Sequence, residues 1–175
     1  MKRLYIAKPH QSIDHAQDGG SEMGKYQFTH SWRLQTTAQA VWERISDFEA
    51  IEDWEGVTFQ KVYHHGHPHG VGDHYRMHIR TRFGYRLAFQ FSIVEKQECA
   101  LIRLEATGDL HGYGIFRLKQ CGDCTVLHYY WEVQTTKPWM KWCEPWLRPF
   151  FIWNHNQVIY RGIQGLTQHL KLQLP

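Results

Sequence analysis

The densest group of side chains able to do chemistry is histidine-rich. Four histidines fall within residues 64–69, and His74 and His78 follow closely. Imidazole nitrogens bind zinc, copper and nickel, so this density is compatible with a metal site. A structural site needs fixed ligand spacing and partners behind the ligands, whereas this stretch carries Gly66 and Pro68 and is typical of a connection between strands. We therefore expect a solvated loop and no functional metal, with metal binding as the alternative.

A second motif with chemical potential is Cys121-Gly122-Asp123-Cys124. The C-x-x-C spacing is that of a redox pair or of half a zinc site. No second C-x-x-C exists, and Gly-Asp between two strand-like segments is typical of a hairpin turn, which we predict here. The other two cysteines, Cys99 and Cys143, are scattered, so the framework of a disulfide-rich secreted domain is not indicated.

His30 and Asn156 are the best candidates for function, because both are polar groups expected to face inward. His30 alternates with Phe28 and Trp32 on one face of a strand, and Asn156 interrupts the apolar stripe of a helix. A buried imidazole or amide needs a hydrogen-bond partner. That partner is either a group of the fold or a carbonyl or hydroxyl of an apolar ligand.

Apolar and aromatic side chains expected to line the same space complete the candidate ligand-binding set. They are Trp32, Trp54, Tyr75, Met77, Tyr85, Phe89, Phe91, Tyr129 and Trp131. Aromatic walls offer large contact area, and a tyrosine hydroxyl can donate to an oxyanion. If the protein is an enzyme, His30 and Tyr129 are the candidate acid/base residues. The same stripes also suit a filled core, so a closed interior remains an alternative.

The elements that must position these residues begin with an alternating strand from Tyr26 to Leu34. A capping sequence at 36–39 opens a helix, and a second short helix is expected through Phe48 and Ile51, ending at 54–56. Six further strands follow, separated by short polar turns. They are Val57–His64, His74–Thr81, Tyr85–Val94, Ala100–Ala106, Leu110–Lys119 and Thr125–Thr135. Gly112 and Gly114 lie inside one of them, where glycine marks a bend or the close approach of another backbone.

The end of the chain changes its period. Pro138, Pro145 and Pro149 exclude one uninterrupted helix before Phe150. After it a stripe recurs at helical steps, which predicts a long amphipathic helix whose inward face carries Ile152, Asn156, Ile159, Ile163, Leu166 and Leu170. The fold class is therefore α+β, with a seven-stranded antiparallel sheet.

Length and charge limit the function classes. The 175 residues suit a flexible extension at 1–24 and one domain at 25–175. Twenty basic against seventeen acidic residues give a net charge of +3, too weak a surplus to indicate nucleic acid. No apolar run approaches the length of a bilayer, and the N-terminus has no apolar signal region, so a cytoplasmic location is expected. Nucleotide and hydrolase motifs are absent, and no cofactor is expected.

The order of these elements resembles the helix-grip fold of the SRPBCC (START/Bet v 1-like) superfamily. Several local strings resemble its polyketide cyclase/dehydrase and lipid-transport branch. They include Ala40-Val41-Trp42, Gly70-Val71-Gly72-Asp73, Gly108-Asp109-Leu110-His111-Gly112 and Tyr130-Trp131-Glu132-Val133. The resemblance covers residues 25–172 and implies a curved sheet around the C-terminal helix. Between them it implies a cavity for a lipid, sterol, polyketide, quinone or similar molecule, but no catalytic motif.

Three functions from different classes follow. The first is binding of a small hydrophobic ligand, and the second is a cyclase or dehydratase that uses cavity His or Tyr as acid/base. The third is a protein-interaction module with a filled cavity. The aromatic and basic segment 137–153 is expected to form a packed lid, with transient contact with a membrane surface as the alternative. Oligomeric state is not indicated.

Overall fold

In the computed structural model the described residues are 24–52, 54–67, 69–80, 86–136 and 144–172. The predicted extension at 1–24 therefore lies outside them except for Gly24. The elements are, in chain order, β1 (Lys25–Leu34), α1 (Ala38–Ile45), β2 (Val57–Tyr63), β3 (His74–Arg80), β4 (Arg86–Gln97), β5 (Leu101–Gly108), β6 (Leu110–Cys121), β7 (Cys124–Thr135) and α3 (Glu144–Leu172).

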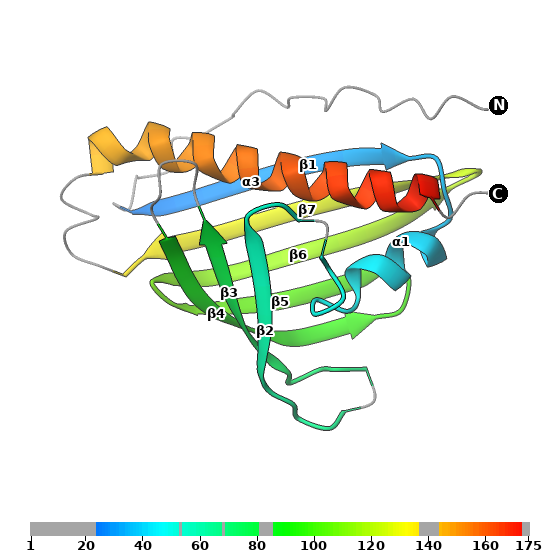
Figure 1. Cartoon of the computed structure of the whole chain (residues 1–175), viewed down its shortest axis with the longest axis horizontal. Coiled ribbons are helices and arrows are strands. Elements are labelled where there is room, and N and C mark those ends of the chain that lie inside the picture. The colour runs from blue at the N-terminus through cyan, green and yellow to red at the C-terminus, as the bar shows by residue number, and fades with distance from the viewer. Residues whose placement is uncertain (1–23, 53, 68, 81–85, 137–143, 173–175) are drawn as a thin grey trace.

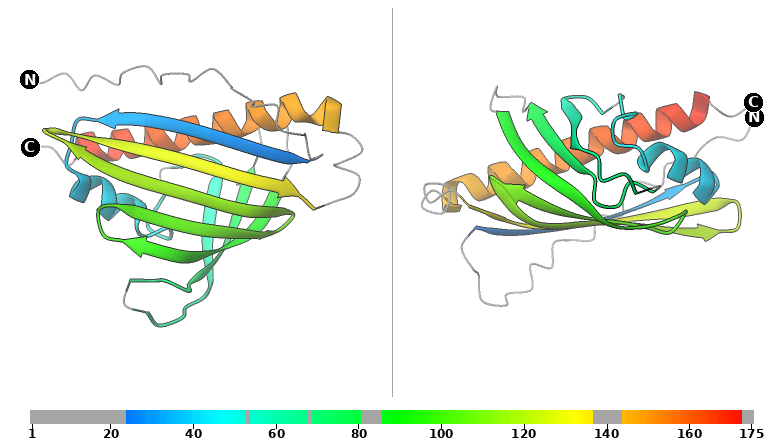
Figure 2. Two further views of the ribbon diagram at one scale, coloured as in Figure 1. Left: turned by 180° about the vertical axis from the view of Figure 1, so that it is seen from behind. Right: turned by 90° about the horizontal axis from the view of Figure 1, so that it is seen from below.

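All seven strands form one antiparallel sheet in the order β1-β7-β6-β5-β4-β3-β2. The helix α3 runs along one face of this sheet, and α1 lies beside one of its ends (Figure 1). The views from behind and below show the strands curving around α3 (Figure 2). The predicted seven-stranded sheet and the helix-grip architecture are confirmed.

The strands form because apolar and polar residues alternate along them. On β3 the side chains of Tyr75, Met77 and Ile79 are buried, while the intervening residues of the strand are exposed. The inward faces of β4 and β7 are buried in the same way. Two-residue periodicity thus directs one side of the curved sheet toward α3, as the sequence predicts.

Two glycines of β6 mark close approaches. A Cβ atom on Gly112 would lie 2.0 Å from the backbone oxygen of Glu132, and one on Gly114 would lie 2.5 Å from the ring of Trp131. The predicted close approach of another backbone is confirmed at Gly112, whereas at Gly114 the close neighbour is a side chain. Gly114 thereby leaves space for an indole that faces the interior.

The first helix follows its sequence prediction, but the second does not. Thr37 caps α1, since its side chain accepts a hydrogen bond from the Ala40 backbone N–H at 3.2 Å. The described residues after it, 46–52 and 54–56, form turns and bends instead of the expected short helix. Local bonds compete with helix formation here, such as the Glu49 N–H donating to the Asp47 carboxylate.

The long C-terminal helix begins earlier than predicted. It starts at Glu144 and includes Pro149, so the prolines do not delay it to Phe150. Pro145 lies in the first turn, where the missing N–H has no helical partner to lose, and Pro149 removes only one hydrogen bond from the second turn. Within the described residues no helix is long and apolar enough to cross a membrane.

The C-x-x-C motif forms the predicted hairpin turn. Cys121 and Cys124 are register partners at the ends of β6 and β7, and Gly122 adopts a left-handed φ of 60° between them. The two cysteines are joined by a disulfide, which the sequence analysis did not predict.

Candidate ligand-binding cavity

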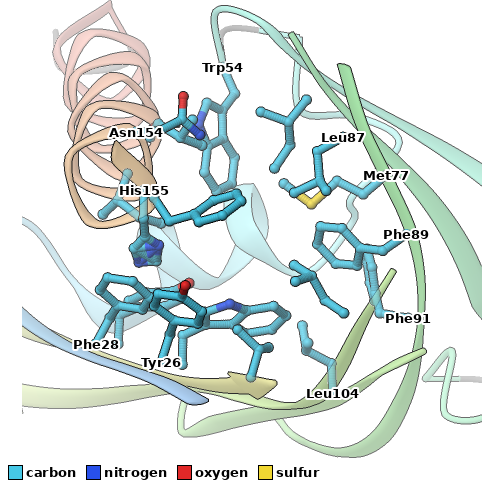
Figure 3. A pocket seen from close by; sticks show the side chains of 18 of the residues that line it. Tyr26, Phe28, Trp54, Met77, Leu87, Phe89, Phe91, Leu104, Asn154 and His155 are labelled. Carbon is cyan, nitrogen blue, oxygen red and sulfur yellow. The ribbon is translucent and has the colours of Figure 1, made fainter. Parts of the chain in front are cut away.

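A cavity of about 110 Å³ lies between the sheet and α3. It continues into space that is open to solvent, and the volume free of protein atoms then reaches about 900 Å³. Figure 3 shows Met77, Leu87, Phe89 and Phe91 on one side and His155 projecting from α3 on the other. Its lining is almost wholly apolar and strongly aromatic, as in sites that bury small organic molecules.

Most of the residues proposed from the sequence reach this interior. The cavity is lined by six of them, namely Trp54, Met77, Phe89, Phe91, Tyr129 and Trp131. Trp32 lines a second, smaller cavity described below. Tyr75 is buried beside the lining, where its ring stacks on Phe91 with centroids 5.2 Å apart. Tyr85 lies outside the described residues.

The inward orientation predicted for Asn156 is wrong, because its side chain is exposed on α3. The buried stripe of the helix includes Val158 and Ile159, and the position three and four residues before them is His155, one step from Asn156. The apolar pattern of Ile and Leu residues was therefore assigned one residue too far along the chain at this position. Anchoring the phase on Val158 would have identified His155.

His155 is the principal polar group of the main cavity, as we call the 110 Å³ space. Its ring stacks on Phe28 with centroids 3.6 Å apart, and the rings of His30 and Tyr129 lie 5.8 and 5.9 Å away. Its Nε2 atom is buried without a hydrogen-bond partner in the described part of the chain. His30 itself does not line the cavity but packs behind it, between His155 and Trp32.

Burial lowers the pKa of His155 from 6.5 to about 3, and the neighbouring His30 contributes to this shift. The imidazole is therefore neutral at physiological pH, with one nitrogen that donates and one that accepts. Burial also raises the pKa of the Tyr129 hydroxyl well above 10. The cavity thus presents uncharged hydrogen-bonding groups to whatever occupies it.

Two further groups add polarity at the lining. The Oγ1 atom of Thr135 is buried without a hydrogen-bond partner among the described residues, and Asn154 lies one residue before His155 on the same helix. A buried polar atom without a partner costs roughly 1–3 kcal/mol. A ligand oxygen that reached the His155 Nε2 or Thr135 Oγ1 atom would remove that cost.

The pKa of His155 predicts a pH-dependent stability. In the unfolded chain this histidine takes up a proton below pH 6.5, whereas in the folded protein it does so only near pH 3. Stability is therefore lost as the pH falls below 6.5, by about 2 kcal/mol between pH 7 and pH 5. Urea unfolding at pH 7 and pH 5 measures how much the free energy of unfolding falls between the two values. This fall should be about 2 kcal/mol smaller in His155→Gln than in the wild type. Equal losses in the two proteins would mean that the ring is hydrated.

A second cavity of about 60 Å³ adjoins the main one. Its lining is apolar apart from Arg44, whose guanidinium donates to the Ala50 carbonyl oxygen. Four residues line both cavities, namely Trp54, Phe116, Tyr129 and Ile159. These shared side chains lie at the boundary between the two spaces.

A charged cluster lies at the start of β3, around Asp73. Asp73 as a whole residue is 1% exposed. Its carboxylate accepts hydrogen bonds from the His65 backbone N–H and from His64 Nδ1, both at 2.9 Å. The Lys61 ammonium lies 3.5 Å from the Asp73 carboxylate and 3.4 Å from the Glu49 carboxylate. Burial alone would raise the pKa of Asp73, but these hydrogen bonds and charges outweigh it and lower the pKa below 3.8.

The histidine-rich stretch forms the connection between β2 and β3, as predicted, with Pro68 outside the described residues. His64 and His65 are held by Asp73. In the part of the chain that the structure describes, no three His, Cys, Asp or Glu side chains are arranged to hold a metal ion.

The described part of the aromatic and basic segment is packed at Phe151, which lines the main cavity, but not at Trp146. Residues 137–143 lie outside the described part, but Trp146 is 88% exposed and Trp153 is 39% exposed on α3. Arg148 between them lies over the ring of Tyr26. The lid interpretation is therefore wrong for Trp146.

No protein-family model and no curated protein matches this sequence. Solved structures do match. The structure of TTHA0849 from Thermus thermophilus aligns over 85% of this chain and 100% of its own, with a TM-score of 0.70 and 14% identity. A START superfamily protein from Mycobacterium smegmatis aligns over 85% and 99%, with a TM-score of 0.66 and 14% identity.

A third match is the di-domain ARO/CYC BexL from the BE-7585A biosynthetic pathway. It covers 84% of this chain and 50% of its own length, with a TM-score of 0.68 and 14% identity. At such identities the likeness concerns the fold alone.

Proposed function

We propose, on the premise that this chain has the helix-grip fold of the SRPBCC superfamily, that it binds an uncharged small hydrophobic molecule in the main cavity. The observation that carries the proposal is the neutral His155 ring, whose buried Nε2 atom lacks a partner among the described residues in an otherwise apolar, aromatic-walled space. As the sequence analysis expects, we take this binding to occur in the cytoplasm.

The composition of the lining favours a flat, largely apolar ligand with at least one hydroxyl or carbonyl oxygen. Burial of apolar surface supplies roughly 25 cal/mol per Å², and aromatic side chains such as Phe28, Phe89 and Trp131 offer broad faces for it. A neutral imidazole can donate to a carbonyl or accept from a hydroxyl. A carboxylate would bring an unpaired charge into this space, at high cost.

A cyclase or dehydratase is the second candidate, favoured by the fold match with an ARO/CYC protein. Efficient acid/base catalysis needs groups whose pKa lies near the working pH. A His155 pKa of about 3 makes this ring a weak base, and the raised pKa of Tyr129 makes its hydroxyl a weak acid. The acid/base chemistry of the cavity therefore supports binding more than catalysis.

The proposal is tested with two probes of the same shape, naphthalene and 2-naphthol, which differ by one hydroxyl. We expect the wild type to bind both and to prefer 2-naphthol. His155→Phe should abolish that preference, a loss of about three- to ten-fold in 2-naphthol affinity for one hydrogen bond, while naphthalene binding stays unchanged. Dissociation constants come from displacement of an apolar fluorescent dye.

Asn156→Ala is the matched control, since this neighbouring side chain is exposed and should leave both affinities unchanged. A wild type that binds neither probe nor the dye contradicts the proposed function and favours the interaction module. If each probe binds His155→Phe with the same affinity as the wild type, the cavity is still the binding site, but His155 is not the group that binds the hydroxyl.

A further inference from the structure

Trp54 has an unusual position between the two cavities. Its indole N–H donates to the Val158 carbonyl oxygen of α3 at 2.7 Å, and its ring lies against Gly162, where a Cβ atom would approach it to 2.6 Å. One face of α3 thus binds the ring through the Val158 carbonyl oxygen, and one turn later Gly162 leaves room for it because it has no side chain. The indole is docked on α3 and lines both cavities.

The other three residues that line both cavities belong to regular elements. Phe116 is on β6, Tyr129 on β7 and Ile159 on α3, whereas Trp54 belongs to the turns between α1 and β2. Tyr129 and Ile159 are buried, and Phe116 packs on Tyr129 with ring centroids 5.0 Å apart. Of these four, Trp54 is the one carried by a turn, so its substitution changes no side chain of the sheet or of α3.

Beyond Trp54 the second cavity offers an apolar environment apart from Arg44, whose guanidinium donates to the Ala50 carbonyl oxygen. Trp32, Ile45, Leu127 and Leu166 are among its lining residues, and Ile163 lines it but not the main cavity. An unbranched hydrocarbon chain matches this surface, because it needs no hydrogen bond and gains from each methylene that it buries.

We propose that Trp54 sets the length limit of the ligand by closing the main cavity off from the second cavity, which takes an alkyl tail only when the Trp54 side chain is removed. This inference rests on the proposed function, since it concerns a ligand whose polar end lies in the main cavity. Replacing Trp54 by a small residue would join the two spaces and admit a longer tail.

The test uses straight-chain primary alcohols of increasing length, which are neutral and carry one hydroxyl. In the wild type, affinity should rise about four-fold per methylene while the chain fits the main cavity, and then stop rising. In Trp54→Ala the same steps should continue for several more methylenes. Trp54→Leu takes the place of Trp54→Ala if the alanine variant does not fold.

A second substitution ties the gain to the second cavity. Ile163→Phe fills the second cavity. Alone, it should leave the alcohol affinities of the wild type unchanged. Combined with Trp54→Ala, it should cancel the added affinity for longer alcohols, and a double-mutant cycle measures this coupling. Trp54→Phe keeps a ring but loses the bond to Val158, and it should retain the wild-type length limit.

An unchanged length limit in Trp54→Ala overturns the inference while leaving the proposed function intact. A longer limit that Ile163→Phe does not cancel also overturns it, because the extra chain then lies elsewhere. Failure of the wild type to bind any alcohol or the two naphthalene probes instead contradicts the proposed function itself.

Discussion

Gly112→Ala is expected to lower the free energy of unfolding by about 3 kcal/mol or more, out of the roughly 5–15 kcal/mol typical of a domain. The added Cβ atom would lie 2.0 Å from the Glu132 backbone oxygen and 2.8 Å from the Val133 Cα atom. Neither neighbour is a flexible side chain, so β6 and β7 would have to separate locally and lose ladder hydrogen bonds. Urea unfolding followed by fluorescence or circular dichroism measures the change.

Gly122→Ala is the matched control for this substitution. Gly122 has a φ of 60° in the β6–β7 turn, and no atom of the described residues lies within 4 Å of an added Cβ atom. Only the cost of a left-handed conformation applies, about 1–2 kcal/mol. Equal losses in the two variants would contradict the steric argument and would mean that β6 and β7 can separate at Gly112 without cost.

Asp73→Ala is expected to destabilise the fold by about 2–4 kcal/mol, because it removes a buried carboxylate that satisfies several donors at once. The His65 N–H and His64 lose their acceptor, and Lys61 loses one of its two carboxylates. These bonds tie the connection between β2 and β3 to the sheet, since the Asp73 carbonyl oxygen also accepts from Ile93 on β4. Urea unfolding at pH 7 measures the loss.

Glu49→Ala serves as the comparison, since it removes the other, half-exposed carboxylate beside Lys61 and should cost about 1 kcal/mol or less. The pH dependence gives a second check. The folded pKa of Asp73 is below its usual 3.8, so the stability it contributes is complete above pH 3.8 and declines as the pH falls below that value. A difference between wild type and Asp73→Ala that vanished already near pH ~6 would point to another group.

The sheet could be predicted from the sequence because its signal is local. Alternation along β3, β4 and β7 fixes which side chains face inward, and the two-residue period leaves no intermediate phase. Gly112 and Gly114 were informative for the same reason, since a missing side chain in a regular strand has few explanations. Most of the cavity-lining residues predicted from the sequence followed directly from these strand faces.

The helix side of the cavity was harder to predict. A helical stripe spans several residues per turn, so a shift of one position exchanges Asn156 for His155 without disturbing the Ile and Leu positions that define the pattern. On β1 the sequence analysis selected His30 and Trp32, whereas Tyr26 and Phe28 line the main cavity, where their rings contact Phe151 and His155 of α3. Such contacts between distant segments leave no trace in a single local pattern.

The turns between α1 and β2 illustrate a third limit. Apolar spacing through Phe48 and Ile51 suits a helix, yet Phe48 is held by rings from three strands, Phe59, Tyr75 and Phe91, and Trp54 by the backbone of α3. Tertiary anchors at both ends of a short segment override its weak helical preference.

The strand order has a consequence for how the protein is made. Among the described strands, β1 pairs with β7 alone, through contacts such as Gln27 with Glu132 that are 105 residues apart in the chain, and α3 follows β7. During synthesis β1 therefore cannot pair with β7, and its aromatic face stays exposed, until nearly the whole domain has been made. Truncated chains that end before α3 would expose the apolar side chains that line the main cavity, so they would be prone to aggregation.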